Sequence, residues 1–411
     1  MILIKNVQLV DGSITDLEIA SDANDVIDGG GLTALPAVID PHVHFRTPGM
    51  EYKEDWTTAA RAAINGGCTL VFDMPNTLPP TVTAELLAEK KLIIDKQLQQ
   101  AGIPLRYELF FGADKAHLAQ IPLVKSQVIG IKVFMGCSTG NLVIDDEESL
   151  NAVFSIAAQN DMIVAVHAED EEMMVERKQE YFEAGNYACH SVIRNIDVAA
   201  RAVEKAINLT RKYGTRLYVL HVSSAEEIAL IKAAKLEGLP VFAETTPHHL
   251  FFDTTSYDTL HGKCVVNPPL RDKSHHAALF VAIHEKVIDT IGSDHAPHTM
   301  EEKAKPYGQC PSGMPGIEFM LPVLLNAHHQ GLISLQEVVA LTSQNARHIF
   351  RIEDYQDWVL VNLKKTATVS ATASKCGWSP YMGQQLTGWP VFTIVCGKVF
   401  PNAQRINVRI A

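Results

Sequence analysis

Eight short apolar runs, separated by segments of helical composition, limit what this chain of 411 residues can fold into. Near-continuous apolar strands that alternate with helices are typical of a parallel α/β sheet covered on both faces. Eight such units predict a closed (β/α)8 TIM barrel, in which an active site lies at the carboxyl ends of the strands. The expected strands are Val38–His44, Cys68–Met74, Arg106–Phe111, Ile129–Phe134, Ile163–His167, Leu217–His221, Val241–Glu244 and Asp289–Asp294.

The chain also extends beyond the barrel at both ends. Met1–Val10 has the pattern of a strand, and Trp358–Leu363 and Val391–Val399 have the pattern of late strands. A chain of this length has room for a second, smaller domain beside one barrel. We therefore assign residues 34–353 to the barrel and expect the flanking segments to form a small β domain.

The first barrel strand and the residues after it carry His42, His44 and Arg46 at alternate positions. Alternate side chains of a strand point to the same side, so these three can face one pocket. Imidazole nitrogens are common zinc ligands, and a guanidinium can bind a carboxylate through two parallel hydrogen bonds. An H-x-H pair alone is weak support for a metal site, because two histidines on a half-exposed strand form the same pattern.

Four more strands carry polar side chains in the region where they end. Lys132 lies in strand four, and His167, His221 and Asp294 end strands five, six and eight. A single histidine at a strand end is more often a hydrogen-bonded core residue than a metal ligand. Four histidines, a lysine and an aspartate at one end of the same barrel instead predict a metal centre.

Lys132 is surrounded in the sequence by the apolar residues Ile131, Val133 and Phe134. Poor solvation lowers the pKa of a lysine and favours its neutral amine. A neutral amine can add carbon dioxide to form a carbamate, an anionic group whose two oxygens can bridge two metal ions. A snorkelling lysine or a buried ion pair fits this residue equally well by itself, but beside four histidines and an aspartate we favour carbamylation.

Seven further motifs follow one another between residues 42 and 318. They are His42–Gly49, Met74–Thr77, His167–Asp170, Thr246–Leu250, Asn267–Arg271, Gly292–His298 and Gly313–Glu318. Together with the residues at the strand ends, these motifs resemble those of the dihydroorotases, a branch of the binuclear amidohydrolase superfamily. The segment Lys132–Gly140 resembles the type of dihydroorotase in which the lysine is carbamylated.

The resemblance implies a role for each residue of the metal centre. The implied ligands are His42, His44, Lys132, His167, His221 and Asp294. One zinc ion would be held by His42, His44 and Asp294, and a second by the histidines that end strands five and six. The carbamate of Lys132, formed from carbon dioxide or bicarbonate, and a hydroxide would bridge the two ions. Asp294 would also be the catalytic general acid and base.

The implied reaction is the reversible cyclisation of N-carbamoyl-L-aspartate to L-dihydroorotate and water, a step of de novo pyrimidine biosynthesis. The substrate carboxylate would be bound by Arg46, Asn76 and His298, with Asn267 and the backbone of Gly316 nearby. Ring closure turns a dicarboxylate into a monocarboxylate and consumes a proton. Lower pH should therefore favour cyclisation.

Two alternatives stay open. A related cyclic amidase, such as a hydantoinase or an allantoinase, would share the metal centre, whereas a non-catalytic scaffold on this fold would usually have lost metal ligands. Three departures from the family pattern lie away from the ligands: Ala37 in place of glycine, Thr47 in place of glutamate, and an atypical stretch from Asp354 onward. The resemblance also implies that both termini, residues 1–33 and 354–411, form one small β-sandwich.

Composition argues against several other classes of protein. The formal net charge of −12 is unsuited to binding nucleic acid, which needs a basic face. No apolar run approaches the roughly 18 residues of a membrane span, and the first apolar stretch lacks the basic flank of a signal peptide. The seven cysteines form no C-x-x-C motif and have the pattern of reduced thiols. We expect a cytoplasmic enzyme that acts on a small molecule, with no nucleic acid or membrane partner, and a homodimer is the assembly left open.

Two acidic runs and one loop complete the sequence-based predictions. Asp145–Glu148 and Glu169–Glu172 are expected in the first turns of helices, where the helix dipole favours carboxylates, rather than in binding sites. Gly136–Leu142 is rich in small residues, and this composition fits both a mobile lid and a rigid turn.

Overall fold

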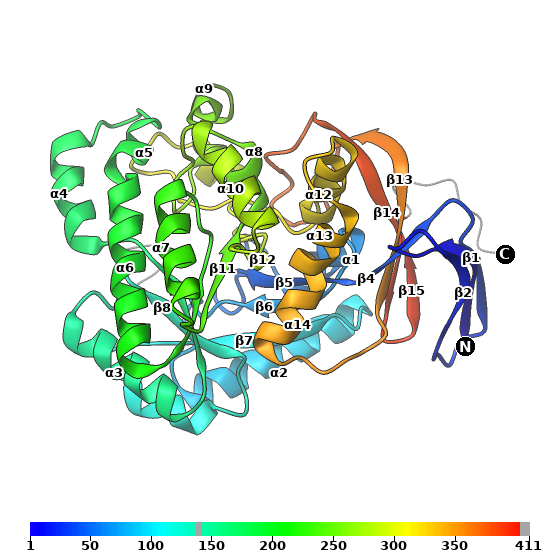
Figure 1. Ribbon diagram of the computed structural model, residues 1–411, viewed down its shortest axis with the longest axis horizontal. Helices are drawn as coiled ribbons and strands as arrows, with labels where there is room; N and C mark the ends of the chain where they lie inside the picture. Colours follow the sequence, from blue (N-terminus) through cyan, green and yellow to red (C-terminus); the bar gives the residue numbers. More distant parts are fainter. Residues whose placement is uncertain (137–141, 403–411) are drawn as a thin grey trace.

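The computed structural model describes residues 1–136 and 142–402, and it contains the expected barrel (Figure 1). Most of the segment considered as a lid, residues 137–141, lies outside the described residues. Eight parallel strands pair in chain order from β5 to β12. The strands are β5 Val38–Val43, β6 Cys68–Asp73, β7 Arg106–Gly112, β8 Gly130–Phe134, β9 Ile163–His167, β10 Arg216–Val219, β11 Val241–Thr245 and β12 Thr290–Ile291.

The barrel closes just beyond the ends of its first and last strands. The N–H of His44 donates to the carbonyl oxygen of His295 at 2.8 Å, and Val43 forms an isolated parallel bridge with His295. β10 and β12 end earlier than predicted, so His221 and Asp294 lie past their strands rather than in them. Both residues have positive φ angles, 40° and 45°, which a strand cannot accommodate.

Helices follow most of the strands and cover the outside of the barrel (Figure 1). The connection after β7 is a 3₁₀ helix, Leu118–Val124, and Pro122 inside it has no N–H for an α-helical bond. The helices are α1 Trp56–Asn65, α2 Ala84–Ala101, α3 Glu147–Gln159, α4 Glu171–Tyr181, α5 Cys189–Ile193, α6 Ile196–Tyr213, α7 Ala225–Leu236, α8 Pro247–Phe251, α9 Tyr257–Leu260, α10 Ser274–His284, α11 Met300–Lys303, α12 Met320–His329, α13 Leu335–Val339 and α14 Asn345–Phe350. Among the described residues, none of these helices combines the length and the apolar character that crossing a membrane requires.

Aromatic side chains fill the barrel interior below the strand ends that carry the predicted ligands. Phe350 of α14 packs edge-on against Phe72, Phe110 and Tyr218, with ring centroids 4.9 to 6.2 Å apart. These rings are almost fully buried and belong to one apolar cluster. The barrel is therefore a packed core, and space for a ligand is left at the carboxyl ends of its strands.

The two ends of the chain build the second β domain together, as expected. Its seven strands form a curled sheet to the right of the barrel in Figure 1. β1 pairs with β2 antiparallel and with β3 and β4 in parallel, and β4 continues the sheet through β13, β14 and β15. The strands are β1 Ile2–Gln8, β2 Ile14–Ile19, β3 Asp25–Asp28, β4 Thr33–Pro36, β13 Trp358–Thr368, β14 Gln385–Val395 and β15 Lys398–Pro401.

β14 packs closely against the barrel. A Cβ atom at Gly388 would lie 2.5 Å from the Cβ of Leu325 on α12, so the contact requires a residue without a side chain. Thr393 of the same strand donates its hydroxyl hydrogen to the carbonyl oxygen of Ile64 at 2.7 Å.

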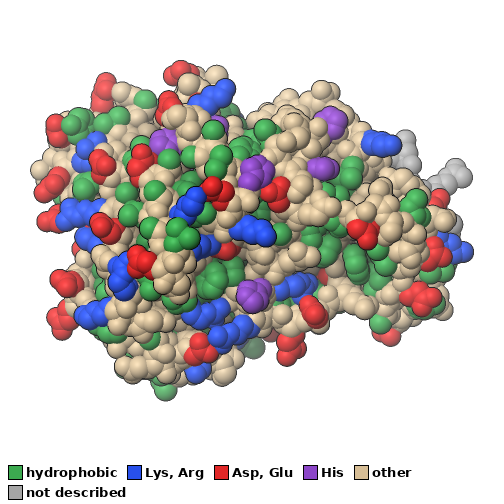
Figure 2. Space-filling view, viewed as in Figure 1, with side chains coloured by type: hydrophobic (Ala, Val, Ile, Leu, Met, Phe, Trp, Pro, Cys, Tyr) green, Lys and Arg blue, Asp and Glu red, His purple; other side chains and the backbone are tan. Residues whose placement is uncertain are grey.

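On the face seen in Figure 2, acidic and basic side chains are interspersed over both domains. Such a mixed face does not offer the positive stripe that a phosphate backbone requires.

A buried ion pair ties helix α2 to the strand end that supports the site. The Lys90 ammonium, which is fully buried, lies 2.6 Å from Oδ2 of Asp73 and donates to the carbonyl oxygen of Met74. Oδ1 of Asp73 accepts the N–H of Phe45 at 2.8 Å. The pair therefore fixes the backbone of a residue next to His44.

We expect Lys90→Met to lower the free energy of unfolding by about 3–5 kcal/mol, because it leaves the Asp73 carboxylate buried without its counterion. Urea unfolding followed by circular dichroism measures this loss. Lys96→Met, an exposed position on the same helix, is the control and should change the free energy by less than about 0.5 kcal/mol. A Lys90→Met protein as stable as the control would contradict the prediction.

Candidate active site

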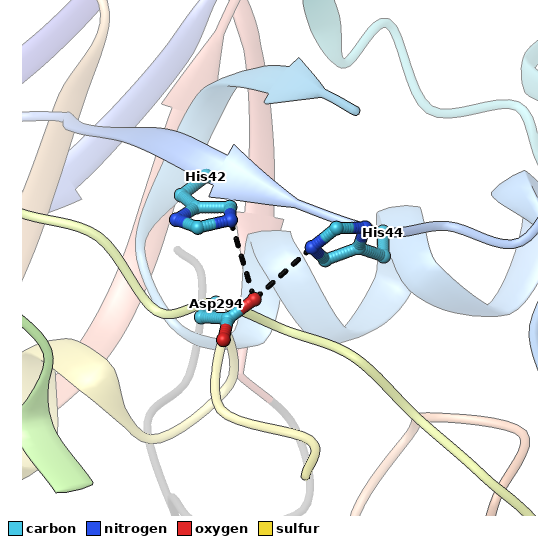
Figure 3. A group of neighbouring side chains, drawn as sticks. All are labelled: His42, His44 and Asp294. Atoms are coloured by element: carbon cyan, nitrogen blue, oxygen red, sulfur yellow. Dashed lines mark ion pairs between the residues drawn. The ribbon is translucent and has the colours of Figure 1, made fainter. Parts of the chain in front are cut away.

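His42, His44 and Asp294 converge on one point at the carboxyl end of the barrel (Figure 3). Nε2 of His42 and Nε2 of His44 lie 3.3 and 3.1 Å from the same Asp294 oxygen, Oδ1. The three ligand atoms lie within 4.8 Å of one another, and all three residues are largely buried. Burial lowers the pKa of His42 and of His44 to about 4. Both imidazoles are therefore neutral at pH 7, as metal ligands must be.

The second pair of predicted ligands lies beside the first. Nδ1 of His167 and Nε2 of His221 are 2.9 Å apart. The rings of His221 and His42 have centroids 5.4 Å apart. His167 and His221 are thus outside the three-residue cluster but in contact with it, an arrangement that suits two adjacent ions better than one.

Lys132 lies in the middle of this group, on β8. It is 1% exposed, and its ammonium lies 4.5 Å from the centre of the Phe134 ring. Burial lowers the pKa of Lys132 to about 7, so a large share of the side chain is neutral amine at neutral pH. The charge of the protonated form lowers the pKa of His42, His167 and His221, so the side chain lies near these three predicted ligands.

Polar partners hold the outer nitrogens of three of these imidazoles. Nδ1 of His42 lies 2.8 Å from Oε1 of Glu244, and Nδ1 of His44 lies 2.7 Å from the amide oxygen of Asn76. Such outer partners fix the tautomer and the ring orientation of ligating histidines. Glu244 was not among the site residues predicted from the sequence. A carboxylate at the end of the apolar strand Val241–Glu244 could have indicated that it belongs to the site.

His167 has the corresponding partner in Glu169. Nε2 of His167 lies 2.8 Å from Oε2 of Glu169, which also pairs with Arg194.

The prediction that Glu169 belongs to the first turn of a helix is wrong, because α4 begins at Glu171 and Asp170 is its N-cap. The same prediction is confirmed for Glu171, Glu172 and, on α3, Glu147 and Glu148.

Three of the predicted site residues have a strained backbone. Arg46, His221 and Asp294 have φ angles of 63°, 40° and 45°. Residues other than glycine adopt such angles at a cost of roughly 1–3 kcal/mol, and they do so mainly where neighbouring structure holds them at a functional site. The strain turns these three side chains from the ends of the strands toward the site.

The donor set fits a divalent metal. Neutral imidazoles and a carboxylate that is ionised at neutral pH are zinc ligands. The pKa of Asp294 lies well below its usual range because His42 and His44 outweigh the opposing effect of burial. Nδ1 of His221 is buried and has no hydrogen-bond partner among the described residues, so the polar capacity of this ring is not fully used by the protein.

A small polar cavity opens beside the cluster. Its lining includes His44, Asp294 and three of the predicted substrate contacts, Arg46, Asn76 and Asn267. Arg46 is 2% exposed, and its Nε donates to the carbonyl oxygen of Pro297 at 3.0 Å. A guanidinium held rigidly in such a cavity is suited to binding a carboxylate.

The two other predicted substrate contacts lie slightly further from the cavity. Nε2 of His298 is 3.1 Å from Nη2 of Arg46, so the ring backs the guanidinium. The N–H of Gly316 donates to Nδ1 of His295 at 3.1 Å. A Cβ at Gly316 would lie 2.9 Å from the carbonyl oxygen of Ser293, which accounts for the glycine there.

The sequence profile of the amidohydrolase family matches residues 33–356. The chain belongs to the amidohydrolase family. It is 31% identical to the dihydroorotase of Methanosphaera stadtmanae, over 97% of this chain and 92% of that protein. It is 34% identical to the dihydroorotase of Pyrococcus furiosus, over 95% of this chain and 87% of that protein. The resemblance to the dihydroorotases is thereby confirmed.

The similar solved structures include hydantoinases and dihydropyrimidinases. An L-hydantoinase (dihydropyrimidinase) from Arthrobacter aurescens is 27% identical and superposes with a TM-score of 0.89, over 97% of this chain and 95% of that chain. A dihydropyrimidinase from Brevibacillus agri NCHU1002 is 25% identical, with a TM-score of 0.85 over 97% and 94%. The TIM-barrel fold is confirmed, and the relatives support a hydrolase of cyclic amides.

Proposed function

We propose that this protein is a dihydroorotase, which interconverts N-carbamoyl-L-aspartate and L-dihydroorotate in de novo pyrimidine biosynthesis in the cytoplasm. The observation that carries the proposal is the cavity that joins the buried Arg46 guanidinium to His44 and Asp294. A cyclic amide bound there with its carboxylate on Arg46 would present its ring to the metal centre. The named dihydroorotases among the relatives support the same substrate.

The metal centre would be binuclear. His42, His44 and Asp294 would hold one zinc ion, and His167 and His221 the other, with the carbamate of Lys132 between them. When bound, the ions would polarise the ring carbonyl and lower the pKa of a water molecule. The buried position of Lys132 near His42, His167 and His221 supports its role as a bridging group.

The residues of the chain would divide the remaining work. Arg46 and Asn76 would bind and orient the carboxylate, and the Asn267 amide, which also lines the cavity, would lie near the bound substrate. Asp294, ionised at neutral pH, would accept the proton released in the attack on the ring carbonyl and deliver it to the amide nitrogen. In the direction of synthesis the same transfers run in reverse.

The main alternative is a hydantoinase-type specificity, which the structural relatives favour. Both enzymes would use one metal centre, and they would differ in whether the substrate carries a carboxylate. A buried guanidinium lining the cavity favours the carboxylate. A non-catalytic scaffold is less well supported, because all six proposed ligand positions are kept.

Lys132→Ala should lose most of the bound metal and most activity, because it removes the bridging carbamate. Lys132→Arg should not restore either, because a guanidinium is not carbamylated. Metal analysis measures the first effect, and a carbon-13 spectrum of protein supplied with labelled bicarbonate detects the carbamate. A fully active, metal-loaded protein with unmodified Lys132 would rule out the carbamate.

Asp294→Asn should lower turnover of dihydroorotate by roughly 10²–10⁴-fold, because the amide cannot carry the proton between water and the leaving nitrogen. Steady-state rates must be divided by the metal content, so that loss of metal is not counted as loss of proton transfer. The proton-transfer role fails if the metal-replete variant keeps more than about a tenth of wild-type turnover.

Substrate preference tests the proposed function directly. We expect the wild-type protein to use dihydroorotate far better than hydantoin, dihydrouracil or allantoin, because those rings leave buried polar groups unpaired, and such sites can discriminate by about 10⁴-fold. Arg46→Lys should reduce kcat/KM for dihydroorotate, since lysine cannot replace two-point binding. The measurement is kcat/KM for the four compounds with metal-replete protein. A carboxylate-free ring that equals dihydroorotate would refute the proposal.

A further inference from the structure

Lys53 is a buried cation that contacts His298. The sequence-based predictions did not include it. It lies between β5 and α1 and is 6% exposed. Its Nζ lies 2.9 Å from Nδ1 of His298 and 3.0 Å from Oε1 of Glu302. Lys53 therefore bridges a histidine that backs Arg46 and a carboxylate on α11.

The hydrogen bonds define the protonation of His298. An ammonium can only donate, so Nδ1 of His298 accepts from Lys53. Nε2 lies 2.9 Å from the carbonyl oxygen of Ser312, which can only accept, and 3.1 Å from Nη2 of Arg46, which can only donate. Because a neutral ring carries one proton and Nδ1 accepts from Lys53, Nε2 carries that proton and donates to Ser312, and its contact with Arg46 is then not a hydrogen bond. Burial, together with the neighbouring Arg46, lowers the pKa of His298 to about 3, which agrees with a neutral ring. This ring directs its N–H toward the carbonyl oxygen of Ser312, a residue of the cavity wall.

Glu302 is an anion placed close to a site that must bind an anion. Its Oε2 accepts the N–H of Thr299 in a capping box and lies 3.6 Å from Nδ1 of His298. Burial alone would raise the pKa of Glu302, but hydrogen bonds from Lys53 and from the backbone N–H of Thr299 hold it below its usual range. The carboxylate is therefore ionised, and Lys53 is its cationic partner at 3.0 Å.

Other cations near this group are already engaged. Nζ of Lys303 donates to the carbonyl oxygens of Val265 and Pro311. Nε of Arg46 donates to Pro297. Without Lys53, the imidazole of His298 would be the nearest basic group to Glu302, and it could take up a proton and pair with that carboxylate.

We propose that Lys53 is a positioning residue that occupies Glu302 and so keeps His298 and Arg46 available for the carboxylate of the substrate. The proposal rests on the proposed function, because it concerns the site that would bind the dihydroorotate carboxylate. Lys53 acts through His298 and Glu302 and does not contact the reacting atoms.

The test is a rescue experiment on the holoenzyme. Lys53→Met keeps the length of the side chain but removes the charge, and it should raise KM for dihydroorotate by about tenfold or more, as expected for loss of a charged hydrogen bond. The change in kcat should stay within about threefold, since the metal centre is untouched. Lys53→Arg should keep most of the wild-type KM.

The decisive variant is Lys53→Met combined with Glu302→Gln. Glutamine at this position can still cap the helix but carries no charge. If Lys53 acts by neutralising Glu302, the double variant should bring KM back to within about threefold of wild type. Lys375→Met is the matched control, because Lys375 pairs with Asp55 of the same loop without contacting His298. A purely structural role of Lys53 would give no rescue, and that outcome, or an unchanged KM in Lys53→Met, overturns the proposal.

A second readout does not depend on turnover. Nitrogen-15 spectra of histidine-labelled protein, with the His298 signals assigned through His298→Gln, report whether Nδ1 carries a proton. We expect an unprotonated Nδ1 in the wild type, a shift toward the protonated form in Lys53→Met, and reversal in the double variant. If the wild type fails to convert dihydroorotate but these shifts occur, the proposed function is wrong and the action of Lys53 on Glu302 stands. Absence of the shifts overturns the role of Lys53.

Discussion

The active end of the barrel depends on the pairing of charges that are buried from water. Several ionisable side chains there are tolerated because another polar group faces them at short distance: Glu244 beside His42, Glu169 beside His167, and Asp294 between two imidazoles. An unpaired charge in such surroundings is costly, so the partners determine where each ring nitrogen points. The geometry of the candidate metal site therefore follows from the polar side chains behind the histidines, Glu244, Asn76 and Glu169, as well as from the histidines themselves.

The same pairing extends to the terminal β domain and explains why that domain bears on the site. Glu54 is a buried carboxylate in the loop after β5. Its Oε2 accepts a hydrogen bond from the hydroxyl of Ser374 and lies 3.4 Å from Nε2 of His295. His295 follows Asp294 and forms the bridge that closes the barrel. Trp378 donates its indole N–H to the carbonyl oxygen of His298 at 2.8 Å. The connection between β13 and β14 thus supports both the closure of the barrel and the anion-binding side of the cavity.

The sequence predicted the barrel and the convergence of the ligands because both follow from short-range rules. Alternation along a strand placed His42 and His44 on one side, and parallel strands brought their ends to one edge. The partners of those ligands could not be predicted in this way, since Glu244 meets His42 across 202 residues of chain. The prediction for Glu169 failed because the exact start of a helix cannot be read from the sequence. Glu169 lies before α4, and its carboxylate turns inward to His167. Lys53 gave no signal at all, since its role depends on the three-dimensional position of Glu302.

The division between strands and loops gives a physical reason why relatives with this fold can differ in substrate. The histidines proposed as metal ligands lie on strands or shortly after them, where the ladder of the barrel limits their movement. Arg46 and His298 lie in loops, and Arg46 is turned toward the cavity by a left-handed backbone that its neighbours maintain. A loop can change its residues without disturbing the barrel, whereas a change in the strand ends would disturb the proposed metal centre. The close superposition on a hydantoinase, with a TM-score of 0.89, therefore reflects the shared barrel, and under the proposed function the choice of ring would rest with the few loop residues around Arg46.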